Sequence, residues 1–410
     1  MSFAMAKEKK DTSSALTKAL TAIQKQTGAS PVSTKAISYG YVSTGSFNVD
    51  MLIGGAQAEG CPPGTLVCPG FPRRRITEVY GPESSGKTTL LISAMRQAQL
   101  AGGCAMFIDF EHALDIGYCR KQGLNTELPA FAHFQPETME DGLKMVTVGI
   151  AAGVDIIGVD SIAAMVAETE MGKKMDEAAK VGGVALKLSQ VLPKFVTWLN
   201  TYPKVDDKPD PNHPGTALVL LNQTRALIQI GGGMPSRGDN ENTAGGKALK
   251  FFDFLRLRVS RISSEYIKTK DPLTGKDVSR AFGNVTNVKV VKNKLNGVQG
   301  HSTSIFLRYG TGIDDHYSVI AGATNKKLIK KDGPWLTLNG QRYQGKDKLR
   351  EHLLKNSDEF ASLKAELAKQ LVASTDAVEP QEGDEIVSGI GDMDLGLAED
   401  DDTDDVVTEE

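Results

Sequence analysis

The chain has 410 residues, of which 40% are hydrophobic, and its formal net charge is −4. This length predicts two or three domains, and the hydrophobic content excludes a wholly disordered protein. The charge is uneven: 15 of the 51 acidic residues and none of the 47 basic ones lie in residues 375–410, which leaves residues 1–374 at about +11. This split indicates either a polyanion-binding body with a modulating tail or a tail that only adds solubility.

Secretory and membrane classes are disfavoured. No apolar run of a signal peptide follows Lys7–Lys10, and Val146–Ala167 is interrupted by two aspartates, so we expect no membrane span. Four cysteines at this length favour a reducing cytoplasm over a disulfide scaffold. Cys61 and Cys68 could bind a metal as a pair, but no further Cys or His pair lies at a zinc spacing, and free thiols in a loop are the alternative.

The first predicted element is a helix over Ser14–Gln26, after a polar stretch that we expect to be disordered. Leu16, Ala19, Leu20 and Ile23 recur at helical spacing. Either the chain's own core or a neighbouring subunit must cover this stripe. Residues 42–56 then lead into a core, and Gly60–Arg75 is rich in Gly, Pro and Arg, which predicts a surface loop.

From residue 76 onward, short apolar strands alternate with amphipathic helices. The predicted strands are Ile76–Tyr80, Ala105–Phe110, Ile156–Asp160 and Ala217–Asn222, and the predicted helices are Lys87–Ala101, Thr138–Ala152 and Gly183–Asn200. This alternation predicts an α/β fold with a mostly parallel sheet flanked by helices on both faces.

The second half of the chain is less regular. It is predicted to hold a polar insertion (Tyr202–Gly215), a glycine-rich loop (Thr224–Gly246), strands over Phe251–Ser264 and Asn284–Lys294 with a hairpin turn at Asp271–Gly275, and a small mixed segment (Asp314–Val372) with a strand at Trp335–Leu338.

A phosphate-binding motif follows the first strand and opens the first helix of this core. Residues 81–88 fit G-x-x-x-x-G-K-[ST]. They are Gly81, Pro82, Glu83, Ser84, Ser85, Gly86, Lys87 and Thr88, and Thr89 follows as a further candidate. The glycines let backbone N–H groups surround a phosphate chain, and the helix N-terminus favours negative charge. Lys87 is predicted to reach the β- and γ-phosphates, and the Thr88 hydroxyl to bind Mg²⁺.

Three polar residues end neighbouring strands. Asp160 suits a carboxylate that holds the metal, although a helix cap is the alternative. Glu111 and Gln223 also follow strands, and ligands of open α/β sheets bind beyond the carboxyl ends of strands. We therefore expect the phosphate-binding loop and these three residues to share one crevice. There Glu111 can activate water and Gln223 can sense the γ-phosphate.

Four segments together resemble the bacterial RecA recombinase family. They read GPESSGKTTL (81–90), EHALD (111–115), VDSIAA (159–164) and KVVKNK (289–294), and the similarity extends from about Ala15 to Leu371. The resemblance implies a RecA-type ATPase core with an N-terminal oligomerisation helix and a small α+β C-terminal domain. The expected boundaries are 1–45, 46–312, 313–373 and, for a disordered acidic tail, 374–410.

The resemblance also implies roles for single residues. Lys87, Thr88, Glu111, Asp160 and Gln223 match the family's phosphate, Mg²⁺, water-activating, metal and γ-phosphate-coupling residues. The resemblance implies that Asp115 and Tyr118 lie beside the adenine. Lys292 and Lys294 match lysines that reach the neighbouring subunit's ATP, whereas by themselves they would be surface charges on an edge strand. The N-terminal helix would pack on the adjacent protomer.

DNA contact is expected on two loops. The first is about Glu168–Gly183 and includes Met171, Gly172, Lys173 and Lys174. The second is the glycine-rich loop, and its candidates are Arg225, Gly231, Gly232, Gly233, Arg237, Gly245, Gly246 and Lys247. Their backbone amides and cations suit a phosphate backbone without base reading. A mere flexible linker is the alternative for this loop.

Several features depart from the family pattern, and they favour a divergent member, such as one carried by a phage. Gly60–Arg75 is long, Tyr202–Gly215 is inserted, Asp271–Asp277 extends a hairpin, and the first loop is less acidic.

The predicted function is a DNA-dependent ATPase that binds ATP and Mg²⁺, forms helical filaments on single-stranded DNA, and pairs it with double-stranded DNA in recombination and repair. The alternatives are a ring-forming RecA-fold motor such as a hexameric helicase, and a non-catalytic DNA-binding scaffold.

Overall fold

The computed structural model describes residues 12–27, 40–54, 68–171, 183–205, 208–210, 212–225, 242–271, 273–295 and 299–373. The chain divides into two units, residues 1–375 and 376–410, and the second unit lies outside the described residues.

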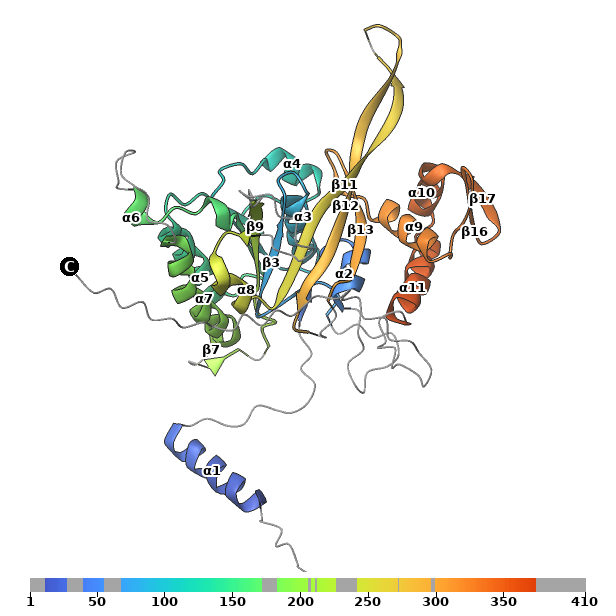
Figure 1. Ribbon diagram of the computed structural model, residues 1–410. Coiled ribbons are helices and arrows are strands. Elements are labelled where there is room, and N and C mark those ends of the chain that lie inside the picture. The colour runs from blue at the N-terminus through green and yellow to red at the C-terminus, as the bar shows by residue number, and fades with distance from the viewer. Residues whose placement is uncertain are drawn as a thin grey trace, which may run out of the picture. The chain divides into compact units, whose positions relative to one another are not determined.

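A ten-stranded sheet organises the larger unit (Figure 1). In spatial order its strands are β14 (Gly312–Ile313), β13 (Ser302–Arg308), β12 (Asp277–Asn293), β11 (Leu255–Lys270), β3 (Arg75–Gly81), β9 (Ala217–Arg225), β6 (Ile156–Asp160), β4 (Ala105–Asp109) and β5 (Phe131–Phe134), with β10 (Asn242–Thr243) beside β9. Strands β11 to β5 are parallel in this order, whereas β11 to β14 and the β9–β10 pair are antiparallel. The predicted parallel core is confirmed.

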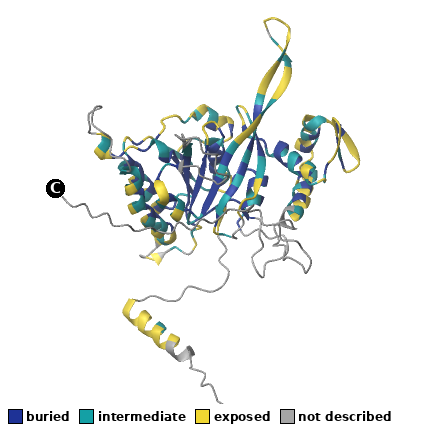
Figure 2. Cartoon of the chain, in the orientation of Figure 1, coloured by how far each residue is buried: buried dark blue, intermediate teal, exposed yellow. Residues whose placement is uncertain are grey.

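Helices cover both faces of the sheet because the strands alternate their apolar side chains between the faces. Val219 and Leu221 of β9 pack with α2 (Phe47–Gly54) and α3 (Lys87–Leu100), whereas Leu218 and Leu220 pack with α5 (Met139–Ala152), α7 (Gly183–Thr201) and α8 (Gly246–Phe252). Figure 2 shows the central strands buried between these layers.

A small mixed segment follows the sheet. It comprises α9 (Asp315–Asn325), β15 (Lys330–Asp332), β16 (Trp335–Leu338), β17 (Gln341–Gln344), α10 (Gly345–Lys355) and α11 (Ser357–Ala373). It has its own apolar core around Ile320, Leu349 and Leu353. Helix α2 joins it to the sheet, because the Phe47 amide donates to Asp315 Oδ1 at 2.8 Å and Asn48 Nδ2 donates to the Ser318 carbonyl at 2.9 Å.

The remaining elements are short, apart from the N-terminal helix. They are α1 (Thr12–Thr27), β1 (Tyr41–Val42), β2 (Phe71–Pro72), α4 (Ile116–Lys121), a 3₁₀ turn (Ile162–Ala164), α6 (Glu168–Met171), β7 (Lys204–Val205) and β8 (Lys208–Pro209). The predicted N-terminal helix is confirmed. Its Leu16 and Ile23 are 62% and 48% exposed.

The predicted ends of some helices and strands are wrong where contacts with distant parts of the chain determine the structure. Phe251 and Phe252 were predicted to open a strand, but they end helix α8, because Ala248, Leu249 and Phe252 pack on the sheet at helical spacing. The strand alternation begins only at Leu255.

The prediction of a surface loop over Gly60–Arg75 is wrong at its C-terminal end. Strand β2 pairs with β1, and Phe71 is fully buried. The Arg73 guanidinium contacts Asp155 at 2.8 Å and donates to the Gly215 carbonyl at 2.7 Å. Residues 60–67 lie outside the described part of the chain.

The β11–β12 hairpin is long, as its sequence suggests. Its strands pair from Leu255 with Asn293 to Lys270 with Asp277, and its outer half extends beyond the neighbouring strands (Figure 1). Ile262, Tyr266 and Ile267 on that outer half are exposed.

Candidate functional site

The phosphate-binding loop connects β3 to α3, and two glycines make its path possible. A side chain at Gly81 would lie 1.9 Å from the Val259 carbonyl oxygen, and one at Gly86, where φ is 97°, would lie 2.2 Å from Leu307 Cδ1. Gly86 is the N-cap of α3 and contributes no side-chain cap, so the first amides of the helix remain open to an anion.

Lys87 and Thr88 begin α3 beside the carboxyl end of β6. Lys87 Nζ donates to the carbonyls of Gly81 at 3.1 Å and Pro82 at 2.8 Å, and burial lowers the pKa of this ammonium. The Thr88 hydroxyl donates to Asp160 Oδ2 at 2.7 Å. Burial raises the pKa of Asp160 to about 6. Hydroxyl and carboxylate oxygens are ligands that Mg²⁺ prefers.

Glu111 and Gln223 meet at the same edge of the sheet, as their strand-end positions predict. Gln223 Nε2 donates to Glu111 Oε1 at 2.9 Å, and the Ser161 hydroxyl donates to the same oxygen at 2.5 Å. Glu111 itself is exposed. These contacts fix the orientation of a carboxylate that faces solvent, which is the arrangement that a water-activating base requires.

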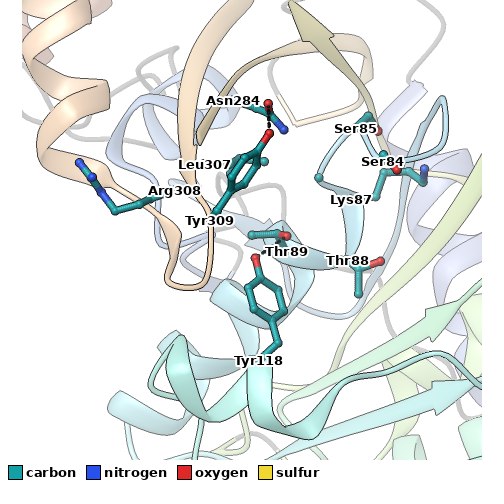
Figure 3. A pocket seen from close by; sticks show the side chains of 11 residues that line it. Ser84, Ser85, Lys87, Thr88, Thr89, Tyr118, Asn284, Leu307, Arg308 and Tyr309 are labelled. Atoms are coloured by element: carbon teal, nitrogen blue, oxygen red, sulfur yellow. Dashed lines mark hydrogen bonds between the residues drawn. The ribbon is translucent and has the colours of Figure 1, made fainter. Parts of the chain in front are cut away.

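A cavity of about 220 Å³ opens beside the phosphate-binding loop (Figure 3). Residues 84–89 form one wall, and Tyr118, Asn284, Leu307, Arg308 and Tyr309 form the other. Tyr118 Oη lies 3.1 Å from Thr89 Oγ1, and Tyr309 Oη donates to Asn284 Oδ1 at 2.7 Å. The sequence interpretation missed Asn284 and Tyr309. The available signal was that Tyr309 is an aromatic residue directly after strand β13.

Three other predicted nucleotide residues make local contacts in the described part of the chain. Asp115 caps α4, and its Oδ1 accepts from the Tyr118 amide at 3.0 Å. Lys292 Nζ donates to the Lys250 carbonyl at 2.5 Å, and Lys294 Nζ donates to the Phe251 carbonyl at 3.4 Å. None of the three lines the cavity of this chain.

The ends of the predicted DNA loops are described, whereas their centres are not. Met171 ends α6 with its side chain 54% exposed, and Gly172, Lys173 and Lys174 lie outside the described residues. The same holds for Gly231, Gly232, Gly233 and Arg237.

The second loop is shorter than predicted. Strand β9 continues to Arg225, which pairs with Asn242 of β10, while Gly246 and Lys247 are exposed residues of α8 and Gly245 precedes it at a φ of 92°. The predicted end of the loop at Gly246 is wrong, because packing of Leu249 extends helix α8 to Gly246, and the DNA-contact candidate Lys247 lies in the same helix.

A buried polar network lies next to the described ends of this loop. Arg256 Nε contacts Glu78 Oε2 at 2.5 Å and Asp253 Oδ2 at 3.4 Å. Asn222 Nδ2 donates to Glu78 Oε1 and to the Ala244 carbonyl, both at 2.8 Å. Burial and the nearby Glu78 raise the pKa of Asp253. The network thus joins the residue before Gln223 to the end of the second loop.

The described residues offer no further metal site. They contain no group of three or more His, Cys, Asp or Glu side chains that could hold an ion. Cys68 is a buried free thiol whose pKa burial raises to about 12, which disfavours the thiolate that a metal needs, and Cys61 lies outside the described part. Among the described helices, none has the length and hydropathy to span a membrane.

Several known proteins are similar to this chain. The RecA N-terminal domain family matches residues 14–314. Protein RecA of Nocardia farcinica is 40% identical over 309 residues, which cover 75% of this chain and 80% of that protein. Protein RecA of Salinispora tropica is 36% identical over 382 residues, which cover 92% and 97%. A solved RadB recombinase aligns with 66% of this chain and 98% of its own at 19% identity and a TM-score of 0.41, which does not bear on the assignment.

Proposed function

The chain belongs to the RecA family, and on that premise we propose how its residues bind a nucleotide and couple its hydrolysis to DNA. It is an ATP-dependent recombinase of recombination and repair, and as an enzyme it is a DNA-dependent ATPase. One observation carries the finer proposal: Lys87, Thr88, Asp160, Glu111 and Gln223 meet at one edge of the sheet.

The phosphate-binding loop, residues 81–89, holds the phosphates of ATP. Lys87 exchanges its two loop carbonyls for phosphate oxygens, and the open amides of α3 bind the same chain. Thr88 and Asp160 hold Mg²⁺, which supplies positive charge opposite the phosphates when bound. Tyr118 and Tyr309 present aromatic faces to the adenine, with Asp115 at the cap beside them.

Glu111 orients the attacking water and accepts its proton. The water oxygen forms a bond to the γ-phosphorus while the bond to the β–γ bridging oxygen breaks, so that ADP and phosphate leave. Ser161 and Gln223 position the Glu111 carboxylate. When the Gln223 amide turns to the γ-phosphate, Glu111 Oε1 keeps only the Ser161 donor and can accept a hydrogen bond from water.

Gln223 couples this chemistry to DNA. It precedes Thr224 and Arg225, which pair with β10, and the neighbouring Asn222 is bonded to Ala244 at the far end of the loop. A shift of Gln223 therefore moves both ends of the second loop. We place single-stranded DNA on the two loops and double-stranded DNA as the pairing partner, with the remaining predicted loop residues as contacts.

The active form is a helical filament with ATP at subunit interfaces. Lys292 and Lys294 reach the neighbouring protomer's nucleotide, and their exchangeable contacts with α8 carbonyls support this role. Helix α1 packs on the adjacent protomer, because its Leu16 and Ile23 are exposed on their own chain. We propose that the chain comprises an N-terminal oligomerisation segment (1–45), an ATPase core (46–312), a small C-terminal domain (313–373) and an acidic tail (374–410). Free Cys68, Cys104 and Cys119 support a cytoplasmic location.

A steady-state ATPase assay with and without single-stranded DNA tests the proposal. Lys87→Ala should abolish turnover, and Glu111→Gln should bind ATP and form filaments but hydrolyse at least ~10²-fold more slowly. Glu127→Gln is the matched control, since its carboxylate is 73% exposed and pairs only with Arg120 among the described residues. Parent-level hydrolysis by Glu111→Gln contradicts the mechanism. Closed rings in electron micrographs with DNA and ATP would favour a ring-forming motor instead.

A further inference from the structure

A second polar cavity lies where the core meets the C-terminal segment. Its volume is about 440 Å³, which falls in the range of small-molecule sites. The middle of α3, the C-cap of α4, residues 311–316 (from β14 to the start of α9) and helices α10 and α11 surround it. It shares no lining residue with the nucleotide cavity.

Two donors on the wall of this cavity lack partners. The Arg96 guanidinium makes no ion pair or hydrogen bond with any described residue. Gln122 is only 8% exposed, and its Nε2 has no hydrogen-bond partner among the described residues. A buried amide donor without a partner is costly, so its presence beside a cavity indicates an acceptor that this side chain can reach there.

The carboxylates of the cavity are already neutralised. Asp314 Oδ2 contacts Arg350 Nε at 2.6 Å and Arg308 Nη2 at 3.0 Å. Asp315 accepts from the Phe47 amide at 2.8 Å and lies 4.0 Å from Lys364 Nζ. These carboxylates therefore leave the charge of Arg96 uncompensated.

One wall of the cavity is aromatic. The rings of His316 and Phe360 are stacked with their centroids 3.9 Å apart, and Lys364 Nζ lies 4.8 Å from the Phe360 centroid. The cavity thus combines a cationic, amide-donating side with a flat apolar side, and such a combination suits an organic phosphate better than a bare ion.

We propose that this cavity binds a small phosphate-bearing molecule, with Arg96 and Gln122 donating to its phosphate oxygens. Arg favours phosphate because its planar guanidinium donates two parallel hydrogen bonds. Lys364 lies at the mouth with its side chain 33% exposed, and its positive charge is shared with Asp315 at 4.0 Å.

The position of the cavity predicts an effect on the nucleotide site. Arg96 lies on α3, which begins at Lys87. Gln122 follows the helix that holds Tyr118, and Thr311 and β14 follow Tyr309. A ligand that fixes these elements biases the walls of the nucleotide cavity, so its binding and nucleotide binding are expected to be coupled reciprocally.

Titration calorimetry with inorganic pyrophosphate tests the proposal on the full chain. The chain is first saturated with a non-hydrolysable ATP analogue and excess Mg²⁺, so that the phosphate-binding loop is occupied. We expect one site per chain, with Kd at least tenfold weaker in Arg96→Gln and in Lys364→Gln. Arg120→Gln is the matched control, because its side chain is 60% exposed and pairs with Glu127 outside the cavity.

The outcomes are distinguishable from a failure of the proposed function, because DNA-stimulated ATPase activity is measured on the same variants. Arg96→Gln should retain that activity within about twofold. Absence of pyrophosphate binding by the parent chain overturns the proposal, and so does an unchanged Kd in Arg96→Gln. An equal loss in Arg120→Gln would show general charge attraction and would overturn it as well.

Discussion

The Glu78–Arg256–Asp253 network makes a quantitative prediction for Arg256→Met. Methionine keeps the volume and removes the guanidinium that contacts both carboxylates. Glu78 and Asp253 are 0% exposed, and breaking one partner of a buried ion pair costs about 3–5 kcal/mol. Arg256 also lies 4.6 Å from the centre of the Tyr80 ring, which adds ~0.5–1 kcal/mol. We expect a loss of roughly 4 kcal/mol in the free energy of unfolding.

Urea denaturation followed by far-UV circular dichroism measures this loss. Arg342→Met is the matched control, since its side chain is 57% exposed and lies 3.7 Å from Asp332, so its change should stay within about 1 kcal/mol. Adding Glu78→Gln to Arg256→Met should recover about 2 kcal/mol, because it removes an uncompensated buried charge. The reasoning is refuted if Arg256→Met unfolds within 1 kcal/mol of the parent, or if the double variant is less stable than the single one.

Three further predictions concern the rest of the chain. Leu16→Asp should leave monomer stability unchanged and weaken filament assembly about tenfold or more in sedimentation assays, whereas Lys18→Asp should act less strongly. At pH 8 the Cys68 pKa of about 12 predicts alkylation roughly 10³-fold slower than for an unperturbed thiol, measured by mass spectrometry, and rapid native labelling would contradict it. Deleting residues 376–410 should speed duplex DNA capture and shift its Mg²⁺ dependence; no change would leave solubility as the tail's role.

The strand-end site could be predicted because local sequence determines where its residues lie. A strand followed by G-x-x-x-x-G-K-T fixes the phosphate-binding loop, and the carboxyl ends of parallel strands bring Glu111, Asp160 and Gln223 to it. The rest of the cavity could not be predicted in this way. Asn284 and Tyr309 come from the antiparallel half of the sheet, where the register of β12 with β13, rather than any motif, places them beside the loop.

Some predicted boundaries of helices and strands were wrong for a related reason. Phe251 is 70% exposed at the end of α8, and its sequence neighbours alternate well enough to resemble a strand. Residues 246–252 form a helix because Leu249 packs on the sheet. Likewise, Phe71 and Arg73 belong to a Gly- and Pro-rich stretch. Strand β1, which pairs with the strand of Phe71, and Asp155, which pairs with Arg73, come from other parts of the chain. Local composition cannot report such contacts.

The resting contacts of the site suggest why hydrolysis depends on DNA. Glu111 Oε1 already accepts from both Gln223 and Ser161, so one of its two oxygens is occupied before any water arrives. If DNA draws the second loop away and the Gln223 amide with it, Glu111 Oε1 keeps only the Ser161 donor and can accept a hydrogen bond from water. Gln223→Glu removes the amide donor, so it should raise basal hydrolysis and remove its stimulation by single-stranded DNA, whereas undiminished stimulation would show that the coupling runs through another residue.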